Sequence, residues 1–128
     1  MDTRQKIIDL TRAAQIASDL KRNGARIRIV TGYFDVLTPD HARRFHALAD
    51  GQPLIALVLD SSDALLGARA RAELAAALAV VDYVVSLDGA AVEQALAMIQ
   101  PDEIVREELA DRQRSQALIE HVHRRQRG

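Results

Sequence analysis

Residues 29–41 of this chain read IVTGYFDVLTPDH, and this stretch decides the fold prediction. A short apolar run meets Gly32, and Thr38 and Pro39 then introduce a helical pattern, because threonine is a common N-cap and proline a common first helical residue. The segment predicts a strand, a turn and a helix with His41 in its first turn. A helix N-terminus suits phosphate, and a glycine lets backbone approach a ligand closely. We therefore expect an anion or nucleotide to bind along this segment.

Helical patterns and apolar runs alternate along the rest of the chain. This alternation predicts βαβ units, and hence a small, doubly wound parallel α/β sheet with helices on both faces. Ligands of such sheets bind beyond the carboxyl ends of the strands, which is where the motif lies. Asp9, Thr38 and Asp88 are the expected N-caps of three helices. The expected strands cover residues 27–30, 54–59, 83–87 and 103–105, and the expected helices cover residues 9–22, 38–50, 68–79, 88–100 and 117–125.

The composition narrows the class of protein. A length of 128 residues suits one domain over residues 1–128. Hydrophobic residues make up 48% of the chain and aromatic residues only 3%, so we expect a core of Ala, Val, Leu and Ile. A net charge of -1 argues against a nucleic-acid partner. The absence of cysteine excludes disulfides, thiolate zinc sites and cysteine nucleophiles. With no apolar run of membrane-spanning or secretory type, we expect a cytoplasmic protein without a membrane partner.

The motif residues resemble the signature of the cytidylyltransferase-like nucleotidyltransferases, Gly-x-Phe-Asp followed by (His or Thr)-x-Gly-His. Here the two phrases are GYFD at residues 32–35 and TPDH at residues 38–41. More of the chain is similar to one branch, the sugar-phosphate adenylyltransferase domain of ADP-heptose synthase. The further matches are RQKI (4–7), DSS (60–62), RAELAAAL (71–78) and VDYVV (81–85). This resemblance implies a Rossmann-like nucleotidyltransferase fold, with Mg²⁺ as a candidate cofactor that accompanies the nucleotide.

The resemblance also implies roles for single residues. His41 would be catalytic if the protein is active. Five of the residues with an implied role also have a structural alternative. The alternative is capping for Thr38, Asp35, Ser115 and Asp60, and packing on the sheet for His41. By resemblance, the nucleotide and phosphate side comprises Gly32, Tyr33, Phe34, Asp35, Thr38, His41 and Ser115, and the acceptor side comprises Asp60 and Ser61.

Asp40 departs from the family pattern, which has glycine at that position. Two like charges about 4 Å apart repel by about 4 kcal/mol at an effective dielectric constant near 20, so this carboxylate would oppose a triphosphate. Mg²⁺ that bridges carboxylate and phosphate would relieve the repulsion. The loops at residues 64–70 and 103–108 are also shorter or poorer in lysine and glycine than those of the relatives.

These departures favour a degenerate nucleotidyltransferase-like domain that binds a nucleotide or a phosphorylated ligand, such as a sugar phosphate, with catalysis weak or lost. One alternative is an active nucleotidyltransferase that joins AMP or CMP to a sugar or polyol phosphate. The other is a structural dimerisation module, which the alanine-rich helices favour. We expect a homo-oligomer under all three interpretations.

Overall fold

The computed structural model describes residues 2–35, 37–61 and 64–108. Its centre is a four-stranded sheet in which all pairings are parallel and the strand order is β3-β2-β1-β4. The strands are β1 (Arg28–Gly32), β2 (Leu54–Leu59), β3 (Tyr83–Leu87) and β4 (Glu103–Arg106). The predicted parallel α/β sheet of Rossmann-like type is confirmed, and the carboxyl ends of β1, β2 and β3 lie at one edge.

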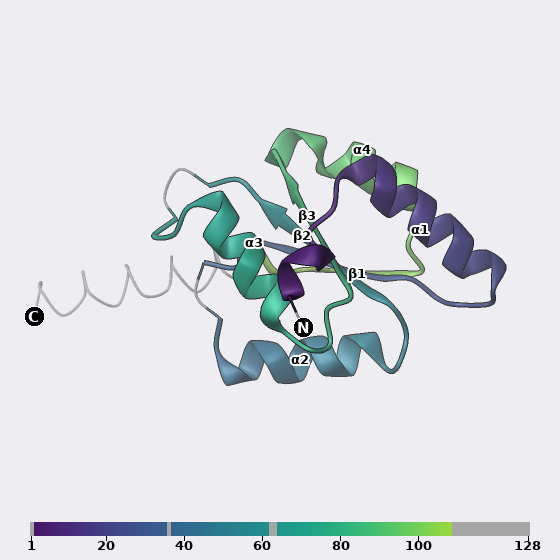
Figure 1. The fold of residues 1–128 in the computed structure, drawn as a ribbon, viewed down its shortest axis with the longest axis horizontal. Helices are drawn as coiled ribbons and strands as arrows, with labels where there is room; N and C mark the ends of the chain where they lie inside the picture. The colour runs from purple at the N-terminus through teal and green to yellow at the C-terminus, as the bar shows by residue number, and fades with distance from the viewer. Residues whose placement is uncertain (1, 36, 62–63, 109–128) are drawn as a thin grey trace, which may run out of the picture.

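Two pairs of helices cover the two faces of the sheet (Figure 1). One face carries α1 (Leu10–Arg22) and α4 (Val92–Ile99), and the other carries α2 (Pro39–Ala49) and α3 (Ala68–Ala77). Two short 3-10 helices, η1 (Thr3–Lys6) and η2 (Gly89–Ala91), precede α1 and α4. The arrangement is the doubly wound one that the sequence pattern predicts.

Alternation along β2 divides the core between the two faces. Ile55, Leu57 and Leu59 pack with α1 and α4, whereas Leu54, Ala56 and Val58 pack with α2 and α3. All six residues of the strand are buried, as expected for a strand covered by helices on both faces. The buried core is mostly Ala, Val, Leu and Ile, as the composition predicts.

The helix boundaries follow the predicted capping residues. Asp9 accepts a hydrogen bond from the Arg12 amide at 2.7 Å, and Asp88 accepts one from the Ala90 amide at 3.1 Å. Two boundaries differ from the prediction: α3 ends at Ala77, and the segment after Asp88 divides into η2 and α4. The predicted helix at residues 117–125 lies outside the described residues.

The first strand is central, between β2 and β4, although two arginines alternate with the apolar residues at its amino end. Arg26 is exposed before the strand, and Arg28 stands at its first position, where the guanidinium pairs with Glu103 of β4 at 3.2 Å. Both charges therefore lie at the amino end of the strand, and residues 29–32 are buried. The opposite, carboxyl end leads into the motif.

Candidate functional site

The chain leaves β1 through a strained turn. Phe34 has a φ of 53°, in the left-handed region that non-glycine residues seldom adopt. Its ring is buried and packs on Phe45 of α2, with the ring centroids 5.8 Å apart. Phe34 thus anchors the turn to the core, while Tyr33 is half-buried and packs toward the face of α1 and α4. The turn is held in place by packing, and its strain is of a kind that accumulates at functional sites.

Asp35 ties this turn to the loop after β2. Its two carboxylate oxygens accept hydrogen bonds from the backbone amides of Leu65, at 2.8 Å, and Leu66, at 2.9 Å. The amide of Leu65, then that of Leu66, and more weakly the charge of Arg71 hold the pKa of Asp35 below its usual value. Both oxygens therefore position the backbone of a loop 30 residues along the chain, which is a different role from capping the turn after β1.

Arg71 is a site residue that the sequence interpretation missed. It comes from α3 and is 1% exposed. Its guanidinium donates to carbonyl oxygens of the turn after β1, of the end of β2 and of the loop before α3. The distances are 2.6 Å to Leu59, 2.9 Å to Tyr33 and 3.1 Å to Leu66. An arginine directly beside Ala72 on the apolar stripe of an alanine-rich helix was the available signal, because a charged residue on a buried face requires polar partners.

Arg71 also places the predicted acceptor side next to the motif. Its Nη2 lies 3.7 Å from the carboxylate of Asp60, which is itself largely exposed. Ser61 is half-buried beside it. The structure therefore brings Asp60 and Asp35 to the same edge through one guanidinium, whereas Ser115 lies outside the described residues.

Thr38 and His41 form a reciprocal capping box at the start of α2. The Thr38 hydroxyl accepts from the His41 amide at 3.3 Å, and Nδ1 of the His41 ring accepts from the Thr38 amide at 3.1 Å. The latter bond requires Nδ1 to carry no proton, so the proton of the neutral ring sits on Nε2. The ring is 7% exposed and lies 6.1 Å from that of Phe45. The capping alternative for Thr38 is therefore present, and the His41 ring is buried beside Phe45 of its own helix.

The N-terminus of α2 offers few amides to an anion. Pro39 has no amide hydrogen, that of His41 points to the Thr38 hydroxyl, and that of Ala42 bonds to the Thr38 carbonyl at 3.3 Å. Three of the first four helical positions are thus unable to give a free donor. The remaining position is Asp40, whose side chain is negative. The positive end of the dipole remains, but its hydrogen bonds are mostly used within the helix.

The carboxylate of Asp40 is directed along its own helix. It is exposed and lies 3.5 Å from Arg43 and 3.5 Å from Arg44. These i,i+3 and i,i+4 pairs screen part of its charge. Asp40 therefore opposes a phosphate less strongly than an unpaired carboxylate at the same position would.

Two buried glutamates that follow β4 fill the space beside Gly32, and the sequence interpretation gave them no role. A Cβ placed on Gly32 would lie 3.2 Å from the Cβ of Glu107 and 3.8 Å from the amide of Glu108. Glu108 accepts a 2.6 Å hydrogen bond from the hydroxyl of Thr31, and Glu107 pairs with Arg44 at 3.1 Å. The glycine thus admits a segment of the protein itself.

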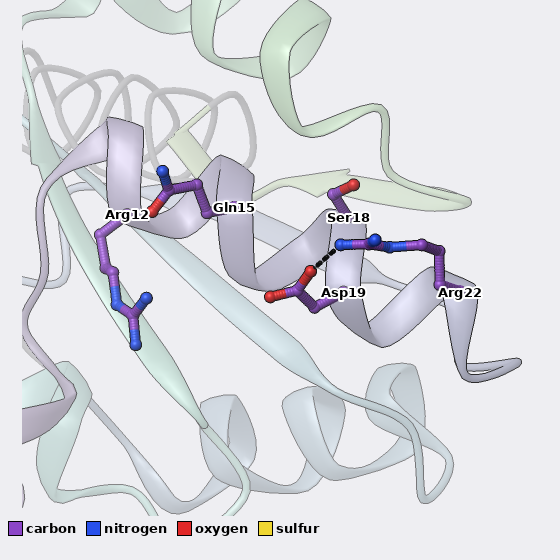
Figure 2. Close-up of a pocket in the computed structure, with 5 residues that line it drawn as sticks. All are labelled: Arg12, Gln15, Ser18, Asp19 and Arg22. Carbon is purple, nitrogen blue, oxygen red and sulfur yellow. Dashed lines mark hydrogen bonds and ion pairs between the residues drawn. The ribbon is translucent and has the colours of Figure 1, made fainter.

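A separate surface depression runs along the outer face of α1 (Figure 2). Its lining residues come from this one helix at spacings of one, three or four positions, which is the polar face of an amphipathic helix. It shares no residue with the motif. The lining residues are Arg12, Gln15, Ser18, Asp19 and Arg22, of which Asp19 and Arg22 form an ion pair.

Residues 2–35, 37–61 and 64–108 also bear on membranes and metals. No helix there combines the length and the apolar character that crossing a bilayer requires. No group of three or more histidine or carboxylate side chains in these ranges is arranged to hold a metal ion.

Comparison with solved structures supports the fold. The chain is similar to a lipopolysaccharide core biosynthesis protein from Thermoplasma volcanium GSS1, with a TM-score of 0.58 and 21% sequence identity. The match covers 63% of this chain and 73% of the other. At this identity the likeness establishes the Rossmann-like α/β fold. No protein-family model and no curated protein sequence matches the chain.

Proposed function

We propose that this chain is a nucleotidyltransferase-like domain that has lost catalysis and retains weak binding of a nucleotide or phosphorylated ligand beside α2. The observation that carries the proposal is the position of Glu107 and Glu108 against Gly32. By the resemblance, Gly32 belongs to the nucleotide and phosphate side, and its missing Cβ would let backbone approach a ligand closely. Here the side chain of Glu107 and the backbone amide of Glu108 lie at that approach, and both residues carry a charge of the same sign as the ligand.

The charges at this edge support the loss of turnover. Nucleotidyl transfer needs groups that stabilise negative charge as pyrophosphate leaves the α-phosphate. Arg71 is engaged with backbone carbonyls, and Arg44 with Glu107 and Asp40. At an effective dielectric constant near 20, each carboxylate about 4 Å from a phosphate oxygen would repel it by about 4 kcal/mol before screening.

The capping box supports the same conclusion. In the related enzymes the motif residues at the positions of Thr38 and His41 serve the phosphates. Here Nδ1 of His41 accepts a hydrogen bond from the Thr38 amide, and the Thr38 hydroxyl accepts one from the His41 amide. A phosphate at this helix end would have to break the cap or use the positive end of the dipole alone, which is worth about 0.3–1 kcal/mol at an exposed site.

Calorimetric titration with ATP, CTP and a sugar phosphate, each with and without Mg²⁺, tests binding. The sugar phosphate belongs in the panel because the structurally similar protein is named for lipopolysaccharide core biosynthesis. Pyrophosphate release with sugar and polyol phosphates as acceptors tests catalysis. We expect weak binding and no turnover. Turnover at about 1 per second or more, within the ordinary enzymatic range, would overturn the proposal.

A double variant tests whether Glu107 and Glu108 oppose phosphate binding beside Gly32. Replacing both Glu107 and Glu108 with glutamine removes two charges and keeps the side-chain shape, so triphosphate affinity should rise about tenfold, equivalent to about 1.4 kcal/mol. Asp19→Asn on α1 is the matched control and should leave the affinity unchanged, because it removes a carboxylate outside the motif. An unchanged affinity in the double variant, with the fold intact by circular dichroism, would show that the glutamates do not control the site.

A further inference from the structure

Exposed leucines are concentrated at α3 and the loop before it. Leu65 is 84% exposed, Leu66 38% and Leu74 37%. These are three of the five exposed large hydrophobic residues in the described part of the chain. Together with Ala70 and Ala77 they form what we call the α3 surface.

Helical periodicity explains the stripe on α3. Its buried positions, which include Ala72 and Ala76, pack on the sheet, yet the opposite face is also apolar. Ala70, Leu74 and Ala77 follow the i, i+4, i+7 spacing of one helix face, and all three are exposed. A surface helix ordinarily carries polar residues on this side, so the stripe is available to a partner.

The two loop leucines are fixed in their exposed positions. The amides of Leu65 and Leu66 are held by Asp35, and the Leu66 carbonyl accepts a bond from Arg71. The loop therefore does not collapse onto the core to hide its side chains. A rigid apolar surface loses little conformational entropy when it is covered.

The charges that flank the stripe indicate the kind of partner. Arg69 and Glu73 lie one turn apart and form a 3.3 Å pair. The 3-10 helix η1 beside α3 adds a second balanced pair, Asp2 with Arg4. With Lys6 of η1, whose ammonium donates to the Leu78 carbonyl at 3.2 Å, this flank holds three cations and two carboxylates. A membrane surface or a nucleic acid would select a larger excess of cations. A two-fold axis across two antiparallel α3 helices would place Arg69 of each copy opposite Glu73 of the other.

We propose that the α3 surface is a self-association face on which a second copy of this chain docks, with the two α3 helices antiparallel. Alanines at positions 70 and 77 allow the helix axes to approach closely, and Leu74 of each copy packs near Ala70 of the other. The helix has ten residues and is about 15 Å long, so the contact is small compared with the roughly 800 Å² per partner of a standard interface. The dimer is therefore weak and depends on concentration. The inference is independent of any ligand at the carboxyl edge.

A charge exchange tests the two-fold geometry. Arg69→Glu makes the flank acidic, and Glu73→Arg makes it basic. Each variant alone should dissociate about tenfold more readily than the wild type in sedimentation equilibrium, because paired charges become repulsive ones. An equimolar mixture of the two variants should restore association as a heterodimer. A wild-type protein that stays monomeric at every concentration, or a mixture that stays dissociated, would overturn the proposal.

Apolar variants supply an independent measurement. Leu74→Glu should abolish association, whereas Met98→Glu, at an exposed methionine of α4, should leave it unchanged. Circular dichroism of each variant checks the fold. Dimers that persist in Leu74→Glu would show that a different face associates. Binding of the wild type to anionic vesicles in place of self-association would show that the apolar surface serves a membrane, and would equally overturn the proposal.

Discussion

Replacing Arg71 with methionine should destabilise the domain more than any change at an exposed arginine. The guanidinium is 1% exposed and donates to the carbonyls of Leu59, Tyr33 and Leu66. A hydrogen bond from a charged donor contributes about 1.5–3 kcal/mol, but these three bonds share one side chain and are not additive. Methionine would also leave three carbonyls without this donor. We expect a loss of about 3–5 kcal/mol, the range found when a buried charged network is broken.

Urea titration followed by far-UV circular dichroism measures this loss. With a slope of about 2 kcal/mol per molar urea, a loss of about 4 kcal/mol lowers the midpoint by about 2 M. Arg71→Lys should fall between the two proteins, because one ammonium group cannot reach all three carbonyls. Arg43→Met is the control: its exposed guanidinium pairs only loosely with Asp40, at 3.5 Å, so the change should stay under about 1 kcal/mol. If Arg71→Met and Arg43→Met unfolded at the same urea concentration, the role assigned to Arg71 would be wrong.

Three further predictions concern the motif. The contribution of Asp35 to stability should be constant above about pH 4 and fall below it, because its lowered pKa stabilises the fold only while the carboxylate is ionised. Asp35→Asn should therefore be less stable at neutral pH, and the difference from the wild type should shrink in acid, as urea titrations of both proteins from about pH 2 to 7 would reveal. Thr38→Ala removes the cap of α2 and should cost about 1 kcal/mol in the same assay, and an unchanged midpoint would contradict the capping role. Asp40→Gly should lower stability by about 1 kcal/mol and, if phosphate binds beside α2, strengthen ATP binding up to about fivefold in calorimetry; weaker binding would instead favour a metal-bridging carboxylate.

The sequence was sufficient to predict the sheet because each strand and helix has a local signal. The continuous apolar run at β2 is buried at every position, and Thr38 with Pro39 begins α2 where predicted. These signals depend on neighbours within a few residues. The central position of β1 was less evident from the sequence, because Arg28 interrupts its pattern and finds a partner, Glu103, 75 residues away.

The site was predictable only in part, because its main contacts join segments that are distant in sequence. Asp35 was identified from its motif, but its partners are amides 30 and 31 residues later. Arg71 belongs to a phrase that resembles the family, and its bond to the Tyr33 carbonyl spans 38 residues. The hydrogen bond between Thr31 and Glu108 spans 77 residues and has no local signal.

The contacts at the carboxyl edge separate into two groups with different consequences for function. Asp35 and Arg71 bond to backbone amides and carbonyls, so they hold the loops whatever ligand is present. Glu107 and Glu108 instead lie beside Gly32, the first through its side chain and the second through its backbone amide. The loss of catalysis that we propose would therefore require no loss of framework, because the bonds that stabilise the turn are distinct from the space beside Gly32. Under the proposed function, this separation would let a chain keep its arrangement of strand, turn and helix while residues of its own occupy the approach to Gly32.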